Sequence, residues 1–195
     1  FTLLIQGCSA AAGVVLAYWY GQVRSQTQRL RDSLDILFRE GVAVSFVRTG
    51  REALFTSMGY VPCPGSQALP QLRARGRRKS RFTLAMLRII SAEEVLRLMP
   101  NSAREGSFVL AVTDEQIPDN NATFRITCAP EGKTVELVDR DYDLRLPVQT
   151  LTRLIYSDAN FQEYLESHAD YDLKMRSPAM EGFFAHHLTV EGKAG

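Results

Sequence analysis

Six basic side chains crowd into residues 73–81, in the sequence RARGRRKSR. Guanidinium and ammonium groups at this density could bind phosphate groups or nucleic acid. Proteins that bind single-stranded nucleic acid usually place aromatic residues between the basic ones so that bases can stack, and none is interleaved here. The surrounding stretch, Pro62 to Arg81, holds three prolines and two glycines and has little apolar content. We therefore interpret residues 66–81 as a basic linker and expect no nucleic-acid partner, with anion binding as the alternative.

Two other groups of side chains could bind a metal ion. His186 and His187 are adjacent, but no third ligand follows at a suitable spacing. Three aspartates alternate as in a calcium-binding loop: Asp139, Asp141 and Asp143. An EF-hand loop that began at Asp139 would need a glycine and a glutamate where this sequence has Leu144 and Thr150. We expect no metal site, and we interpret the aspartates as turn residues.

The three cysteines, Cys8, Cys63 and Cys128, are odd in number and widely spaced. They predict neither a disulfide framework nor a zinc site. Free thiols are typical of a reducing compartment, so we expect a cytoplasmic location. The sequence also lacks a P-loop, a dinucleotide-binding fingerprint and a Ser-His-Asp order.

Charge is unevenly distributed along the 195 residues. The chain up to Arg81 has twelve Lys and Arg against four Asp and Glu, a net charge of +8, whereas the remainder has eleven against eighteen, a net charge of −7. A basic first unit suits an anionic ligand such as a nucleotide-like cofactor. The alternative is that the two oppositely charged halves attract each other.

The uncharged stretch from Phe1 to Tyr20 requires a comparison with a membrane span. It contains polar residues and glycines, and no basic residue precedes it. Gly7-Cys8 resembles a lipoprotein cleavage box only faintly, because the positively charged leader is missing. Buried strands of a covered sheet have the same apolar character, so we expect no membrane partner.

Apolar periodicity predicts two structural units. In residues 1–65 the expected elements are a strand over 12–20, a helix over 26–40, a strand over 42–47, a helix from near Arg51 to Met58, and an extended segment at Tyr60 and Val61. Gly41 and Gly59 are suitable helix ends, and Thr49 can cap the second helix. Alternation of strand and helix predicts an α/β layer.

Residues 82–195 predict an α+β unit. The expected strands are Leu84–Ile90, 106–112, 122–128, 134–138 and 144–146, and the expected helices follow Ser91, Pro147 and Asn160. Ser91 and Glu94 form a capping box, and the segment from Pro130 to Lys133 is a hairpin signal. The tail from His168 shows little pattern.

The first unit resembles the later part of a GNAT N-acetyltransferase of the Eis-like (enhanced intracellular survival) group. The similar segments are YWYGQV at 18–23, QRLRD at 28–32 and LFTSMGY at 54–60. In that family a strand leads into a turn whose backbone amides bind the pyrophosphate of acetyl-CoA at a helix start. The resemblance implies a coenzyme site formed by Val23, Arg24, Gln28, Arg29, Arg31 and Asp32. Only part of the fold is covered, so the first unit is expected to be incomplete or diverged.

The sequence departs from the family pattern at two places. Arg29 and Arg31 stand where glycines are expected; they could contact phosphate directly or cover a helix face. Phe55 occupies the place of a tyrosine that protonates the leaving thiolate in many members, and phenylalanine has no proton to donate. Tyr60 is the tyrosine nearest to that place and is the candidate catalytic residue, with a structural role as the alternative.

The second unit resembles the sterol-carrier-like domain that ends Eis-type acetyltransferases. The similar stretch runs from Phe82 to about Ser167 and includes MLRII at 86–90, FVLAVTD at 108–114 and DLRL at 143–146. The resemblance implies a domain that packs on the acetyltransferase core and supports oligomerisation, so a homo-oligomer is among the expected partners. The chain ends in Gly-Lys-Ala-Gly rather than in the aromatic terminus usual in the family.

These observations predict an acetyl-CoA-dependent N-acetyltransferase that acts on an amine of a small molecule or a peptide. A second hypothesis is a binding or regulatory module that keeps the fold and has lost the chemistry. A third is the binding of an apolar ligand in the sterol-carrier-like unit, which would require a closed apolar cavity there.

Overall fold

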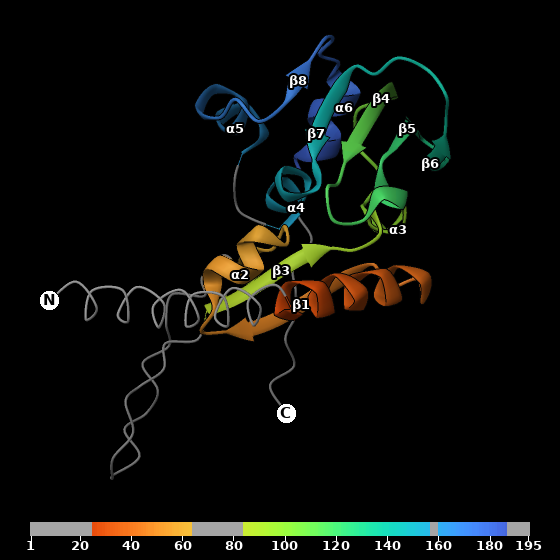
Figure 1. Cartoon of the computed structure of the whole chain (residues 1–195). Coiled ribbons are helices and arrows are strands. Elements are labelled where there is room, and N and C mark those ends of the chain that lie inside the picture. The colour runs from red at the N-terminus through yellow and green to blue at the C-terminus, as the bar shows by residue number, and fades with distance from the viewer. Residues whose placement is uncertain (1–24, 64–83, 157–159, 187–195) are drawn as a thin grey trace, which may run out of the picture.

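The computed structural model of the chain describes residues 25–63, 84–156 and 160–186 (Figure 1). The predicted strand over 12–20, the residues Val23 and Arg24, and the basic segment at 66–81 lie outside the described residues. The described residues form an α/β part with a three-stranded sheet, followed by an α+β part with a five-stranded sheet, as the sequence predicts. Within the described part of the chain, no helix is long and apolar enough to cross a membrane.

The first sheet has the strand order β1-β3-β2, with β1 at Val44–Thr49, β2 at Val61–Pro62 and β3 at Leu84–Ile89. The central strand, β3, is antiparallel to both neighbours. The sequence pattern assigned Leu84–Ile90 to the second unit, but its hydrogen bonds place it in the first sheet. Apart from Arg88, β3 has apolar side chains on both faces, and four of its six residues are buried, as is usual for a central strand covered on both faces.

The segment between β2 and β3 connects two neighbouring strands of one sheet. The backbone N–H of Cys63 donates to the carbonyl oxygen of Ala85 at 2.9 Å, so the chain leaves and returns at adjacent positions. This segment includes residues 66–81, which the sequence pattern interprets as a linker between units. Within the described residues the chain passes from the first sheet to the second where β3 continues through Ile90 into α3 (Ala92–Leu98).

Helix 25–39 covers one face of the first sheet (red in Figure 1). Its buried Leu34 packs in a cluster with Met58 of the turn after α2 (Glu52–Ser57), Met86 of β3 and Ile117. Gly41, with φ of 71°, turns the chain from this helix toward β1. The cap predicted at Thr49 differs in detail: α2 has no side-chain cap, and the Thr49 hydroxyl accepts the Arg51 N–H at 2.9 Å in the preceding turn.

The second sheet has the order β6-β5-β4-β7-β8. Its strands are β4 (Gly106–Thr113), β5 (Ala122–Ala129), β6 (Gly132–Leu137), β7 (Leu144–Pro147) and β8 (Asp172–Leu173), with a 3-10 turn, η1, at Pro118–Asn120. β4 and β7 are parallel, and the other pairs are antiparallel. The predicted hairpin between β5 and β6 is present.

Among the described residues, this part has four α-helices: α3, α4 (Val148–Tyr156), α5 (Phe161–Ser167) and α6 (Pro178–Phe184). Ser91 and Asn160 cap their helices, because the Ser91 hydroxyl accepts the Glu94 N–H and the Asn160 side chain accepts the Gln162 N–H. The predicted capping box is formed only in half, since the Ser91 N–H donates to the Ala43 carbonyl rather than to Glu94. The sequence pattern did not predict β8 or α6. The start of α6 was nevertheless readable, since Ser177 caps it and Pro178 occupies its first position.

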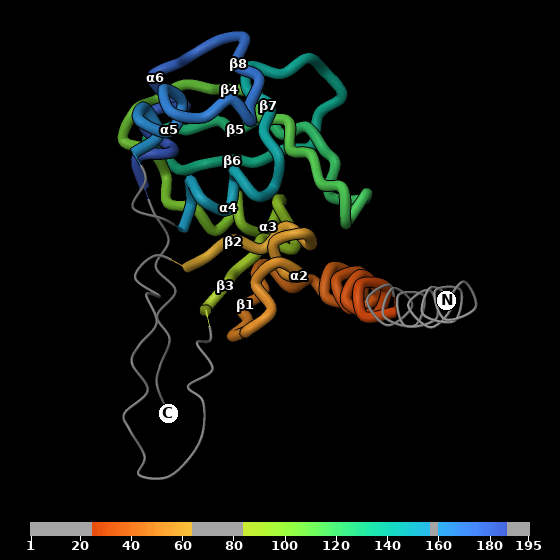
Figure 2. Tube along the Cα trace, turned by 60° about the vertical axis from the view of Figure 1, so that its left-hand side comes forward, coloured from red at the N-terminus to blue at the C-terminus, as the bar shows by residue number. Residues whose placement is uncertain are grey.

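Helix α4 packs against both sheets, and Figure 2 shows it between them. Six of its nine residues are buried, which is typical of a helix enclosed on most sides. Its Thr152 hydroxyl accepts the Ile89 N–H of β3 at 3.3 Å and donates to the Val148 carbonyl at 2.7 Å. One helix therefore ties the first sheet to the second.

Candidate functional site

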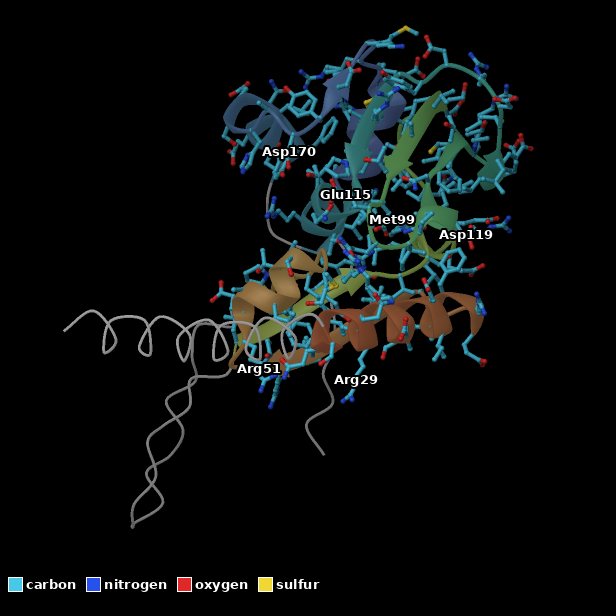
Figure 3. The ribbon with its side chains drawn as sticks, viewed as in Figure 1. Arg29, Arg51, Met99, Glu115, Asp119 and Asp170 are labelled. Atoms are coloured by element: carbon cyan, nitrogen blue, oxygen red, sulfur yellow. The ribbon has the colours of Figure 1, made fainter. Side chains whose placement is uncertain are left out.

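The first described turn of helix 25–39 lies beside the carboxyl end of β1. The helix precedes β1 and runs back along the sheet, and Arg51, two residues after β1, donates through Nη1 to Oε1 of Gln26 at 2.8 Å. Arg29 and Arg51, both exposed and labelled in Figure 3, place two guanidinium groups at this end of the first sheet.

Four of the predicted coenzyme-binding residues lie on this helix, and all four are exposed: Gln28, Arg29, Arg31 and Asp32. Gln28 donates to Asp32 at 3.0 Å, and Arg31 donates through Nε to Gln116 at 2.9 Å, across to the second unit. The helix is already formed at Ser25, so the amides of Arg29, Arg31 and Asp32 point along a helix interior rather than into a turn. These residues can therefore meet a phosphate only through their side chains.

Arg29 is the best placed of the four to bind an anion. Within the described residues its guanidinium has no hydrogen-bond or ion-pair partner, whereas Arg31 is held by Gln116. An exposed guanidinium presents a planar set of donors that matches phosphate oxygens. The structure thus separates two arginines that the sequence treats alike.

Tyr60, the candidate proton donor, is buried, with 2% of its surface exposed. Its ring meets Phe55 edge-to-face at 5.2 Å, and its hydroxyl is 2.8 Å from the Ser45 hydroxyl. Burial raises the pKa of Tyr60, although the Ser45 hydrogen bond and the Arg88 charge act in the opposite direction. The phenol is therefore neutral at physiological pH and is tied to β1.

This geometry predicts that Tyr60→Phe lowers the stability of the fold slightly and changes the rate of acetyl transfer little. Removing one hydroxyl that pairs with Ser45 should lower the free energy of unfolding by about 1 kcal/mol. A general acid, by contrast, contributes about 10²–10⁴ to the rate. Denaturant unfolding together with an acetyl-transfer assay separates the two roles, and a rate loss above a hundredfold would show that Tyr60 donates the proton after all.

A buried ion pair that the sequence analysis did not predict joins β3 of the first sheet to the loop after β4 of the second sheet. Arg88 of β3 and Asp114, just after β4, are both fully buried, and Nη2 of Arg88 lies 2.7 Å and 2.5 Å from the two carboxylate oxygens. Nη1 of Arg88 donates to the carbonyl oxygen of Met58. The Asp114 carboxylate also accepts the N–H groups of Gln116 and Ile117. A single arginine in an otherwise apolar strand was the available signal.

Two of the candidate metal ligands, Asp141 and Asp143, have other partners. Asp141 pairs with Lys174 at 2.6 Å, and Asp143 accepts the Val109 N–H at 2.7 Å. His187 lies outside the described residues. Across the described ranges, His, Cys, Asp and Glu side chains form no group of three that could hold a metal ion.

Residues 88–167 match the sterol carrier protein domain family. The matched range begins within β3 and ends at Ser167, so it confirms that the second unit resembles a sterol-carrier-like domain. No protein of curated function matches the sequence.

Solved structures similar to this chain include three bacterial proteins. A GCN5-related N-acetyltransferase from Anabaena variabilis is 18% identical, with a TM-score of 0.43 over 52% of this chain and 26% of that chain. Eis1 from Mycobacterium abscessus is 20% identical, with a TM-score of 0.41 over 53% of this chain and 25% of that chain. A probable N-acyltransferase from Enterococcus faecalis is 21% identical, with a TM-score of 0.42 over 55% of this chain and 27% of that chain. The chain spans about a quarter of the length of these structures.

Proposed function

We propose that this chain is part of an acetyl-CoA-dependent N-acetyltransferase of the Eis-like GNAT group, acting on an amine of a small molecule or a peptide. The observation that carries the proposal is the order helix 25–39, β1, α2, β2, which follows the family resemblance. Arg29 is three residues after Gln26, whose side chain accepts a hydrogen bond from Arg51 just after β1. The adjoining match to the sterol carrier protein domain agrees with the domain order of that group.

In this proposal Arg29 and Arg51 bind the phosphate groups of the coenzyme. Both side chains are exposed and cationic, and Gln26 holds Arg51 in place. Acetyl-CoA supplies the acetyl thioester that the amine attacks. Tyr60 stabilises the sheet beneath the site rather than supplying a proton, so the acid for the leaving thiolate comes from water or from another part of the protein.

Calorimetric titration with acetyl-CoA tests the proposed site. Arg29→Ala removes a charge-assisted hydrogen bond to phosphate, worth about 1.5–3 kcal/mol, so we expect affinity to fall by about tenfold or more. Arg39→Ala is the matched control, because Arg39 is exposed on the last turn of the same helix. Equal affinity in the Arg29 and Arg39 variants would remove Arg29 from the site, and absence of binding to the folded chain would refute the coenzyme site.

The second candidate is a module that binds but no longer catalyses, and one observation favours it. Phe55 has no hydroxyl, and the hydroxyl of Tyr60 is buried against Ser45, so neither ring presents an acid at the surface. Binding of acetyl-CoA without release of thiol in the presence of amines would support this module over the enzyme.

The apolar-ligand hypothesis finds no support in the packing of the second unit. Aromatic rings fill the space under the second sheet. The ring centroids of Phe108 and Phe183 are 5.5 Å apart, and those of the stacked Phe161 and Phe184 are 4.8 Å apart. All four side chains are at most 4% exposed. A cleft of about 370 Å³ beside α5 and α6 is open to solvent, and polar residues are among those that line it, including Gln162, Arg176 and Glu181.

A further inference from the structure

The loop between β4 and β5 reaches helix 25–39 and α2 of the first unit through one side chain, Gln116. The amide oxygen of Gln116 accepts the Nε–H of Arg31, on helix 25–39, at 2.9 Å. The amide nitrogen of Gln116 donates to the carbonyl oxygen of Ser57, the last residue of α2, at 3.4 Å. One side chain of the second unit therefore links two helices from separate segments of the first.

Hydrogen bonds within the loop fix the backbone that carries Gln116. The Asp114 carboxylate accepts the Gln116 N–H at 2.9 Å, and Arg88 of β3 holds the same carboxylate. The Asn121 side chain accepts the Asp114 N–H at 2.6 Å and donates to the Pro118 carbonyl oxygen at 2.9 Å. The position of Gln116 is thus set by the buried ion pair rather than by the helices that it contacts.

The residue after Gln116 enters the core of the first unit. Ile117 is 1% exposed and lies in the apolar cluster with Leu34 of helix 25–39 and with Met58, just after α2. Apolar packing and hydrogen bonds therefore join the same two helices to the same loop. This loop lies inside residues 88–167, the range that matches the sterol carrier protein domain family.

We propose that Gln116 is a positioning residue for the coenzyme site, an inference that rests on the proposed function. Arg29 lies two residues before Arg31 on helix 25–39, and Arg51 directly precedes α2. A link between the helices fixes the two proposed phosphate ligands relative to each other before the coenzyme arrives. Less ordering is then required on binding, which raises the affinity. Gln116 acts through the helices and does not touch the coenzyme.

Calorimetric titration of the folded full chain with acetyl-CoA tests this role by comparing Gln116→Ala with Glu115→Ala. Glu115 is the exposed neighbour of Gln116 and is labelled in Figure 3, so it is the matched control. From the net strength of one or two hydrogen bonds, we expect Gln116→Ala to weaken binding by about threefold to tenfold. Glu115→Ala should leave the affinity nearly unchanged. Binding by Gln116→Ala as tight as that of the wild-type chain would overturn the positioning role.

Arg31→Ala provides a readout that a general loss of stability would not move. If Gln116 acts through Arg31, Gln116→Ala should weaken binding in the wild-type background and weaken it little further in the Arg31→Ala background. Fully additive effects would overturn the proposal. Tighter binding by Gln116→Ala would overturn it as well, because Arg31 would then be a direct phosphate ligand that Gln116 restrains.

Amide hydrogen exchange of the chain without coenzyme tests the link separately from the proposed function. We expect Gln116→Ala to speed exchange in helix 25–39 and α2 by about threefold to tenfold, with no change in α5. Unchanged exchange in helix 25–39 would overturn the link even if acetyl-CoA binds. If the wild-type chain bound no acetyl-CoA, the proposed function and the positioning role would both fall, and the exchange result would still show whether Gln116 joins the two helices.

Discussion

Replacing Asp114 with alanine is expected to lower the free energy of unfolding by about 3–5 kcal/mol. Arg88 and Asp114 are both fully buried, so the substitution leaves a guanidinium charge without its carboxylate in the interior. The N–H groups of Gln116 and Ile117 lose their acceptor as well. A loss of this size is a large share of the stability of an ordinary domain. Urea unfolding followed by circular dichroism measures it.

Asp119→Ala is the matched control for this prediction. Asp119 lies in the same loop but is exposed, as Figure 3 shows, so its removal should change stability by no more than about 0.5 kcal/mol. Asp114→Asn keeps an acceptor oxygen, so it should lower the free energy of unfolding by less than Asp114→Ala does. A double-mutant cycle with Arg88→Met then isolates the coupling between the two charges. Similar effects of Asp114→Ala and Asp119→Ala would contradict a stabilising role for the pair.

Gly59→Ala is expected to destabilise the chain by at least about 2 kcal/mol, for two separate reasons. The backbone of Gly59 has φ of 82°, a left-handed conformation that disfavours any residue with a Cβ. A Cβ at this position would also overlap Nη1 of Arg88 and lie 3.1 Å from its Cζ. The guanidinium cannot move aside, because Asp114 and the Met58 carbonyl hold it.

Gly41→Ala separates these two reasons. Gly41 has a similar φ of 71°, but nothing lies within 4 Å of a Cβ built there. It should therefore show only the backbone cost of about 1–2 kcal/mol. The amount by which Gly59→Ala lowers the free energy of unfolding more than Gly41→Ala measures the cost of the overlap with Arg88. This difference should shrink when Arg88 is changed to methionine. Equal losses at the two glycines would mean that the guanidinium gives way at little cost.

The sequence predicts local structure well where short-range chemistry decides it. Ser91 and Asn160 cap their helices as expected, because a cap depends on residues two or three positions away. The hairpin after β5 follows from its turn residues in the same way. Such features do not depend on what the distant chain does.

Long-range partners explain what the sequence could not predict. Strand β3 reads as a buried strand, but only its hydrogen bonds to β1 and β2 reveal which sheet holds it. Asp114 looks like a turn residue until Arg88, 26 positions earlier, is seen to reach it. Arg29 and Arg31 are equivalent in the pattern, and only the position of Gln116 distinguishes them.

Hydrogen–deuterium exchange of the chain with and without acetyl-CoA tests the proposed coenzyme site most directly, because it locates the ligand without assuming catalysis. If acetyl-CoA binds as proposed, protection should appear in the first described turns of helix 25–39 and around Thr49 and Arg51, and it should weaken in Arg29→Ala but not in Arg39→Ala. Protection confined to the second sheet and its helices, or no protection at millimolar acetyl-CoA, would contradict the site.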